Sequence, residues 1–98
     1  MDKRFFDYLE LAPRTTKPRK TGLTVISDCQ AELSSVRDTL EAFGEYIDLA
    51  KITVGSLLSE DRVMRKKIAL YKQHGVDLEP AGPIFNIAHY QRKEKELF

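Results

Sequence analysis

Few side chains in this sequence have the chemistry of a nucleophile or a metal ligand. The chain has one cysteine, Cys29, and two histidines, His74 and His89. A catalytic cysteine needs a neighbouring base or a cationic setting, and neither histidine is near Cys29 in the sequence. The two histidines also lack the spacing of a paired metal site. We therefore interpret Cys29 as a space-filling residue, His74 as a helix-ending residue and His89 as a surface residue.

Two charged residues accompany apolar segments and are the better candidates for a site. Asp28 ends the first such segment, where its carboxylate could ligate a metal or could cap the following loop and helix. Lys51 lies inside the second segment, where it could form an ion pair with Asp48 or Glu79 on neighbouring strands. The residues themselves leave these alternatives open.

A basic cluster lies between residues 14 and 20 and contains Arg14, Lys17, Arg19 and Lys20. No aromatic residues interleave these charges as platforms for base stacking, and the formal net charge of the chain is only +1. Nucleic acid and anionic lipid are therefore not expected as partners. We interpret the cluster as a solvated basic loop that leads into the first strand; the alternative is that its charges face an anionic ligand.

The elements that must position these residues form a repeated pattern of strand and helix. Residues 22–28, 48–54 and 76–80 read as short β-branched or apolar strands, and a helix-length segment follows each one. This pattern predicts an α/β fold with a parallel βαβαβα unit. The almost continuous apolar run at residues 23–26 predicts a strand that is covered on both faces. The unit fits an open doubly wound sheet or part of a (β/α)₈ TIM barrel, and no glycine-rich nucleotide-binding motif is present.

The predicted helices have one apolar side each. In the first, Ser35 and Asp38 form a candidate capping pair and Gly44 a stop. The second runs to His74 and is followed by Gly75. Its expected buried side contains Val63, Met64, Ile68, Leu70 and Tyr71, and its expected outer side contains Arg65, Lys66, Lys67 and Lys72. A third helical segment starts at Pro83, a residue favoured in a first turn.

Composition places the chain among globular proteins. Its 98 residues are 42% hydrophobic and 32% charged, and no apolar run is long enough to span a bilayer. A single cysteine excludes an internal disulfide and fits a cytoplasmic location. We divide the chain into an N-terminal apolar segment and basic loop at residues 1–21, in which the apolar part docks onto the body, and three βα units at residues 22–98.

Longer stretches of sequence carry a family resemblance. The first are Lys17-Pro18-Arg19, Gly22-Leu23-Thr24-Val25 with Asp28, and Gly44-Glu45-Tyr46-Ile47-Asp48-Leu49-Ala50-Lys51. Further along the chain are Lys67-Ile68, Tyr71, His74-Gly75-Val76, Pro80, Gly82 and Ile84-Phe85. In this order they resemble the phosphosulfolactate synthases over nearly the whole chain after Leu11.

The resemblance implies a TIM-barrel enzyme, a lyase that adds sulfite to phosphoenolpyruvate with Mg²⁺ to give phosphosulfolactate on the path to coenzyme M. It implies that Asp28 is a catalytic residue and a metal ligand. It implies that Lys51 is a catalytic residue in contact with the phosphate or the enolate. Gly55 and Gly82 correspond to substrate-binding positions. A divalent metal and cationic side chains suit this chemistry because they stabilise the enolate and phosphate charge.

Departures from the family pattern affect the expected activity. Cys29 and Gln30 replace the lysine and glycine of an Asp-Lys-Gly triplet, and Asn86 replaces a glutamate after the third strand. An amide holds Mg²⁺ less strongly than a carboxylate, so we expect weak metal binding. A TIM barrel takes roughly 250 residues and eight strands.

With three predicted strands, we expect the isolated chain to be inactive and to need a homo-oligomer or the rest of a barrel. The alternative is a non-catalytic scaffold that self-associates through exposed sheet edges. A stress-related protein is a further alternative, since heat-stress proteins of plants resemble the same family.

Overall fold

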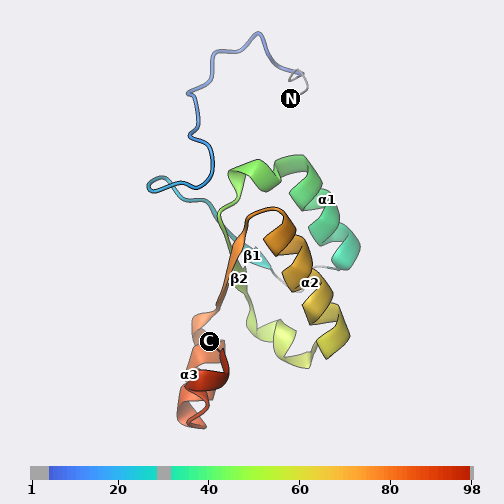
Figure 1. Ribbon diagram of the computed structural model, residues 1–98, viewed down its shortest axis with the longest axis vertical. Helices are drawn as coiled ribbons and strands as arrows, with labels where there is room; N and C mark the ends of the chain where they lie inside the picture. The colour runs from blue at the N-terminus through green and yellow to red at the C-terminus, as the bar shows by residue number, and fades with distance from the viewer. Residues whose placement is uncertain (1–4, 29–31, 98) are drawn as a thin grey trace.

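The computed structural model describes residues 5–28 and 32–97, in which three strands form one parallel sheet (Figure 1). The strands are β1 (Val25–Asp28), β2 (Leu49–Ile52) and β3 (Asp77–Pro80), and they lie in the order β1-β2-β3. Each strand falls inside its predicted range. A helix joins each strand to its parallel neighbour, as a parallel pair requires. The predicted α/β class and parallel winding are confirmed.

Two helices cover the same face of this sheet. They are α1 (Leu33–Phe43) and α2 (Asp61–Gln73), which lie side by side (Figure 1). Both crossovers therefore pass on one side, and the strand order shows no reversal. A doubly wound sheet has helices on both faces, whereas a TIM barrel keeps all of them outside the sheet. The arrangement is consistent with βα units of a TIM barrel.

The hydrophobic core lies between the sheet and these two helices. Its buried members are Val36, Leu40, Ile47, Ala50, Tyr71 and Val76, with Ile26, Leu70 and Leu78 packed against them. Ile26, Ala50 and Leu78 are register partners across the three strands. Since side chains alternate along a strand, this row fixes which strand positions face the helices.

Within residues 5–28 and 32–97, no helix lies over the opposite face of the sheet, so the prediction that the first strand is covered on both faces is wrong. Leu23 and Val25 are 49% and 48% exposed. The physical reason is that both right-handed crossovers place their helices on one side. β1 and the residues before it are therefore apolar enough to be buried on both faces, although the described residues cover only one face.

The third helix continues beyond the carboxyl end of the sheet. α3 (Gly82–Tyr90) carries Pro83 in its first turn, as predicted, and its main contacts are with two 3₁₀ helices, η2 (Val54–Leu58) and η3 (Glu94–Leu97). Figure 1 shows α3 at the opposite end of the molecule from the N-terminal segment. His89 is on its exposed surface, as predicted, where its Nδ1 lies 2.5 Å from a carboxylate oxygen of Glu94.

Two glycines end the first two helices for different reasons. Gly75 follows α2 with φ +67°, a conformation that favours glycine. Gly44 has φ −54° and begins another 3₁₀ helix, η1 (Gly44–Tyr46), but a Cβ there would lie 2.9 Å from His74 Nδ1. The predicted cap at Ser35 is wrong, because α1 already begins at Leu33 and Ser35 lies inside its first turn.

The basic cluster is part of the fold, so the interpretation as a solvated loop is wrong for two of its four cations, Lys17 and Arg19. The Arg19 side chain is only 2% exposed; it pairs with Asp48 at 2.7 Å and donates to the Glu45 carbonyl at 2.8 Å. Lys17 Nζ donates to the carbonyls of His74 and Gly75, at 2.7 and 3.1 Å. The reason is that the ends of η1 and α2 present carbonyl groups without helical partners, which cations can satisfy.

The residues before this cluster extend away from the body (Figure 1). Phe5 and Tyr8 are 89% and 77% exposed, and the ring contacts of Phe6 are with these two neighbours. The predicted docking of this apolar segment onto the body is therefore wrong, because its aromatic rings pack on one another. Among the described residues, no helix is long and apolar enough to cross a membrane.

Candidate functional site

The carboxyl ends of the three strands carry the predicted site residues, which the structure divides between the two faces of the sheet. Ser27, Lys51 and Glu79 are register partners and follow the row of Ile26, Ala50 and Leu78 by one residue. They therefore lie on the helix-free face. Lys51 occupies the middle strand of this polar row.

The Lys51 side chain makes no hydrogen bond and no ion pair with any residue in the described ranges. The sequence leaves open that Lys51 forms an ion pair with Asp48 or Glu79, and neither pair is present. Asp48 instead pairs with Arg19 and accepts the Thr24 backbone N–H at 2.8 Å. These partners, Thr24 first and then Arg19, hold the pKa of Asp48 below its usual value. The ammonium of Lys51 thus stays available to an anion on the helix-free face.

Asp28 lies on the other face, under α2. Its Oδ1 is 3.1 Å from Lys67 Nζ, and its Oδ2 accepts a hydrogen bond of 2.9 Å from the Tyr71 hydroxyl. Both charged side chains are almost completely buried. Burial, and then the hydrogen bond to Asp28, raises the pKa of Tyr71, so the phenol keeps its proton. The structure does not bring Asp28 and Lys51 together.

The prediction that Lys67 lies on the outer side of the second helix is wrong. Lys67 is 2% exposed. It lies one helical turn before Tyr71 and one turn after Val63 and Met64, so the 3–4 residue spacing puts it in the centre of the buried side. That spacing is the signal which could have identified it.

The two predicted glycines lie just beyond the strand ends. Gly55 is in η2, after β2, and Gly82 is the first residue of α3, after β3. A Cβ added to Gly82 would meet no atom within 4 Å, so local packing does not require glycine there. Thr53 Oγ1 donates to the Asp28 carbonyl at 2.8 Å and thereby connects the ends of β1 and β2. The roles of both glycines in substrate binding stay predictions.

The described residues do not fit a magnesium centre. No group of three or more His, Cys, Asp or Glu side chains within residues 5–28 and 32–97 could hold a metal ion. Both carboxylate oxygens of Asp28 accept hydrogen bonds from Lys67 and Tyr71, so a cation approaching it would have to displace an ammonium group. Asn86 is on the exposed side of α3, and Cys29 lies outside the described residues. We assign no step of a reaction to a metal.

Sequence comparison identifies the family. A family model described as (2R)-phospho-3-sulfolactate synthase (ComA) matches residues 12–98. The chain belongs to this family. The predicted resemblance is therefore confirmed.

Three phosphosulfolactate synthases are similar to it. The protein of Methanothermobacter thermautotrophicus is 36% identical over 94 residues, which are 95% of this chain and 36% of the relative. The protein of Bacillus subtilis is 35% identical over 90 residues, which are 91% of this chain and 35% of the relative. The protein of Methanocaldococcus jannaschii is 37% identical over 77 residues, which are 78% of this chain and 31% of the relative. The chain spans about a third of the length of these curated relatives.

Proposed function

We propose that this chain forms part of the substrate site of a phosphosulfolactate synthase, an enzyme that adds sulfite to phosphoenolpyruvate. In this proposal Lys51 binds the anionic substrate. The observation that supports it is the position of Lys51 in the middle strand, on the helix-free face and without a partner among the described residues. In a TIM barrel this face lines the interior, and the carboxyl ends of the strands form the active site.

The chemistry requires a cation at such a position. The sulfite sulfur forms a bond to the methylene carbon of phosphoenolpyruvate, and the electron pair of the double bond moves onto the adjacent carbon and its carboxylate. A proton then arrives at that carbon. An ammonium group fixed next to the carboxylate stabilises the charge that develops during this step. The phosphate carries further negative charge that Lys51 can contact in the same site.

These 98 residues are proposed to be inactive by themselves. Among the described residues, β1 and β3 each pair on one side only, and the polar row of Ser27, Lys51 and Glu79 lies on an open face. Electrostatic stabilisation of an enolate needs a site from which water is excluded. We therefore propose that activity requires further strands, supplied by another chain or by more of the same one. We also propose a cytoplasmic location, because a single cysteine suits a reducing compartment.

The test uses a chimera as well as the isolated chain. Residues 12–98 replace the matching third of the Bacillus subtilis relative, and phosphosulfolactate is detected by phosphorus NMR after incubation with phosphoenolpyruvate, sulfite and Mg²⁺. We expect no turnover by the isolated chain and turnover by the chimera. Lys51→Met should lower kcat/KM of the chimera by about 100-fold or more, as loss of a charge-stabilising group does.

The matched control is Lys72→Met, which removes an exposed lysine from the outer side of α2 and should leave kcat/KM unchanged. Turnover by the isolated chain would contradict the proposed need for further strands. Equal activity of the chimera with and without Lys51 would contradict the proposed role of this residue.

A second candidate function is a non-catalytic scaffold that self-associates. The observation in its favour is that, in the described part of the chain, β1 and β3 each have one unpaired edge, since an unpaired strand is a template for another chain. Light scattering coupled to size-exclusion chromatography tests it directly. A monomer at all concentrations would exclude this function.

A further inference from the structure

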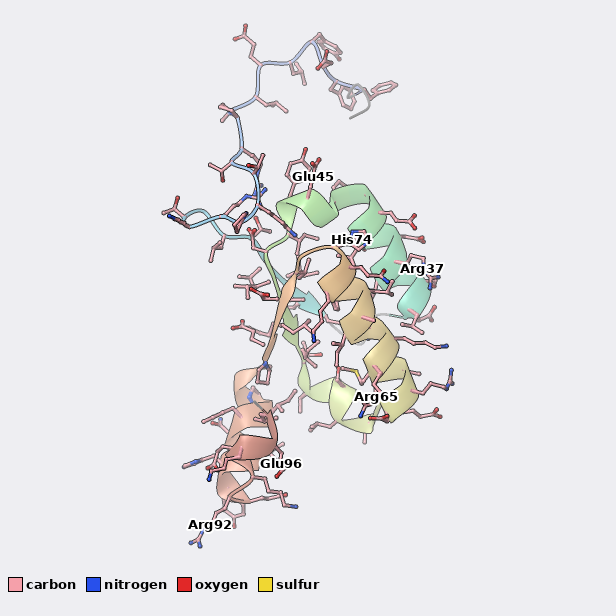
Figure 2. The ribbon with its side chains drawn as sticks, in the orientation of Figure 1. Arg37, Glu45, Arg65, His74, Arg92 and Glu96 are labelled. Atoms are coloured by element: carbon pink, nitrogen blue, oxygen red, sulfur yellow. The ribbon has the colours of Figure 1, made fainter. Side chains whose placement is uncertain are left out.

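A cavity with several charged lining residues lies at the amino-terminal end of the sheet, opposite the strand ends that carry the proposed substrate site. Its volume is about 470 Å³, within the range of small-ligand sites. The side chains that matter for its chemistry are Arg14, Lys17, Arg19, Glu45, Tyr46 and His74. Figure 2 shows Glu45 on η1 and His74 at the end of α2, at the same end of the molecule.

Positive charge predominates around this cavity. Three cations from residues 14–19 line it, whereas Glu45 is its acidic lining residue. Asp48 neutralises Arg19 from behind through their ion pair of 2.7 Å. Burial and, to a smaller extent, the charge of Arg19 lower the pKa of Lys17, against the opposing effect of Asp48. The protein alone therefore leaves the ammonium of Lys17 incompletely stabilised.

The cations also hold hydrogen-bond donors that the described residues do not use. Arg19 Nε is buried and has no hydrogen-bond partner among the described residues, and the Arg19 side chain as a whole is only 2% exposed. Its two terminal nitrogens already donate to Asp48 and the Glu45 carbonyl. A buried donor without an acceptor is destabilising, and an ion is one of its ordinary explanations.

The other two cations have donors to spare. Lys17 Nζ donates to two carbonyl oxygens and keeps a third proton. Arg14 uses Nη2 alone, which donates to Thr24 Oγ1 at 2.9 Å and to the Tyr46 carbonyl at 3.5 Å, and its guanidinium lies 5.3 Å from the centre of the Tyr46 ring. The ring holds this guanidinium at the edge of the cavity.

We propose that this cavity binds a small oxyanion, such as phosphate, between Arg14, Lys17 and Arg19. A tetrahedral oxyanion offers several acceptor oxygens in one compact group, which suits three cationic side chains that line the same cavity and keep unused donors. The ligand is either the free ion or the phosphate group of a larger molecule, because both present the same oxygens. The site is separate from Lys51 and does not depend on the proposed catalytic function.

The experiment follows the Arg19 Nε–H signal in the full chain by nitrogen-15 NMR. Inorganic phosphate is titrated against sodium chloride of equal ionic strength, and a phosphate monoester is titrated separately. We expect a saturable shift of this signal with phosphate and none with chloride. Tighter binding of the monoester would identify the anion as part of a larger molecule, and tighter binding of phosphate would identify the free ion.

Arg14→Gln should weaken phosphate binding by about tenfold, as loss of one charge-assisted contact does. Arg14 is exposed, so this variant should fold; circular dichroism checks that it does. The matched control is Arg37→Gln, an exposed arginine on α1 that lies outside the cavity (Figure 2). The proposal is overturned if no saturable shift occurs below about 10 mM phosphate. It is also overturned if Arg14→Gln binds as tightly as the Arg37→Gln control.

Discussion

The buried contact between Asp28 and Lys67 predicts a large and specific loss of stability on replacing the lysine. At 3.1 Å, two unit charges attract by about 5 kcal/mol if the effective dielectric constant is about 20. Desolvation of both groups offsets most of this attraction, so the pair itself adds little net stability. Lys67→Met removes the attraction but leaves the buried carboxylate. We therefore expect the free energy of unfolding to fall by about 3–5 kcal/mol.

The measurement is urea denaturation followed by circular dichroism. The matched control is Lys66→Met, which removes the adjacent, exposed lysine and should change the free energy of unfolding by less than about 0.5 kcal/mol. Tyr71→Phe should cost about 1–2 kcal/mol, because it removes one hydrogen bond to the same carboxylate. Replacing both charges, with Asp28→Asn and Lys67→Met together, should recover part of the loss.

The reasoning is refuted if Lys67→Met is as stable as Lys66→Met. It is also refuted if the double replacement is less stable than Lys67→Met alone, since the buried carboxylate that Lys67→Met leaves behind is then not the cause. An unfolded Lys67→Met variant beside a folded double variant would support the argument even without a measured free energy. The comparison thus remains informative for a protein of small total stability.

Three further predictions follow from single contacts. Asp48 has a lowered pKa in the folded state. Its stabilising effect is therefore complete above the pKa of this aspartate in the unfolded chain, about 4, and is lost as pH falls through the folded pKa. Asp48→Asn should reduce this loss of stability in acid denaturation. Tyr71 has a raised pKa, so stability should decrease as pH rises above about 10, and Tyr71→Phe should remove that decrease in alkaline urea titrations. Gly75→Ala should lower the melting temperature, at a free-energy cost of about 1 kcal/mol, because φ is +67° there, whereas Gly82→Ala should leave it nearly unchanged because its Cβ meets open space.

The strand and helix pattern was predictable because it depends on local features. Each strand lies within its predicted range, Gly75 follows α2 and Pro83 lies in the first turn of α3, where the sequence indicates. The face assignment of the first strand was not predictable from the run at residues 23–26. Apolar residues on both sides of a strand indicate that both faces are to be covered, but they do not say which part of a protein covers each.

The contacts of the basic cluster at the amino-terminal end of the sheet were also not predictable from the sequence. The basic cluster is conspicuous in the sequence, yet its contacts join Lys17 to His74 and Arg19 to Asp48 across separations of 57 and 29 residues. Such pairings depend on tertiary structure, which brings the ends of η1 and α2 next to the cluster. Composition alone describes these side chains as surface charges, because lysine and arginine are rarely buried without a partner.

Lys51 and Lys67 show why residue type did not separate a structural cation from a candidate functional one. Lys67 follows the apolar spacing of α2 and reaches Asp28 beneath the helix, where its charge is compensated. Lys51 follows the alternation of β2 onto the helix-free face, and the described residues offer it no partner. A lysine whose charge is not used in folding can be replaced at little cost to stability. Its presence in the middle strand therefore needs another explanation, and binding of an anion at that face provides one.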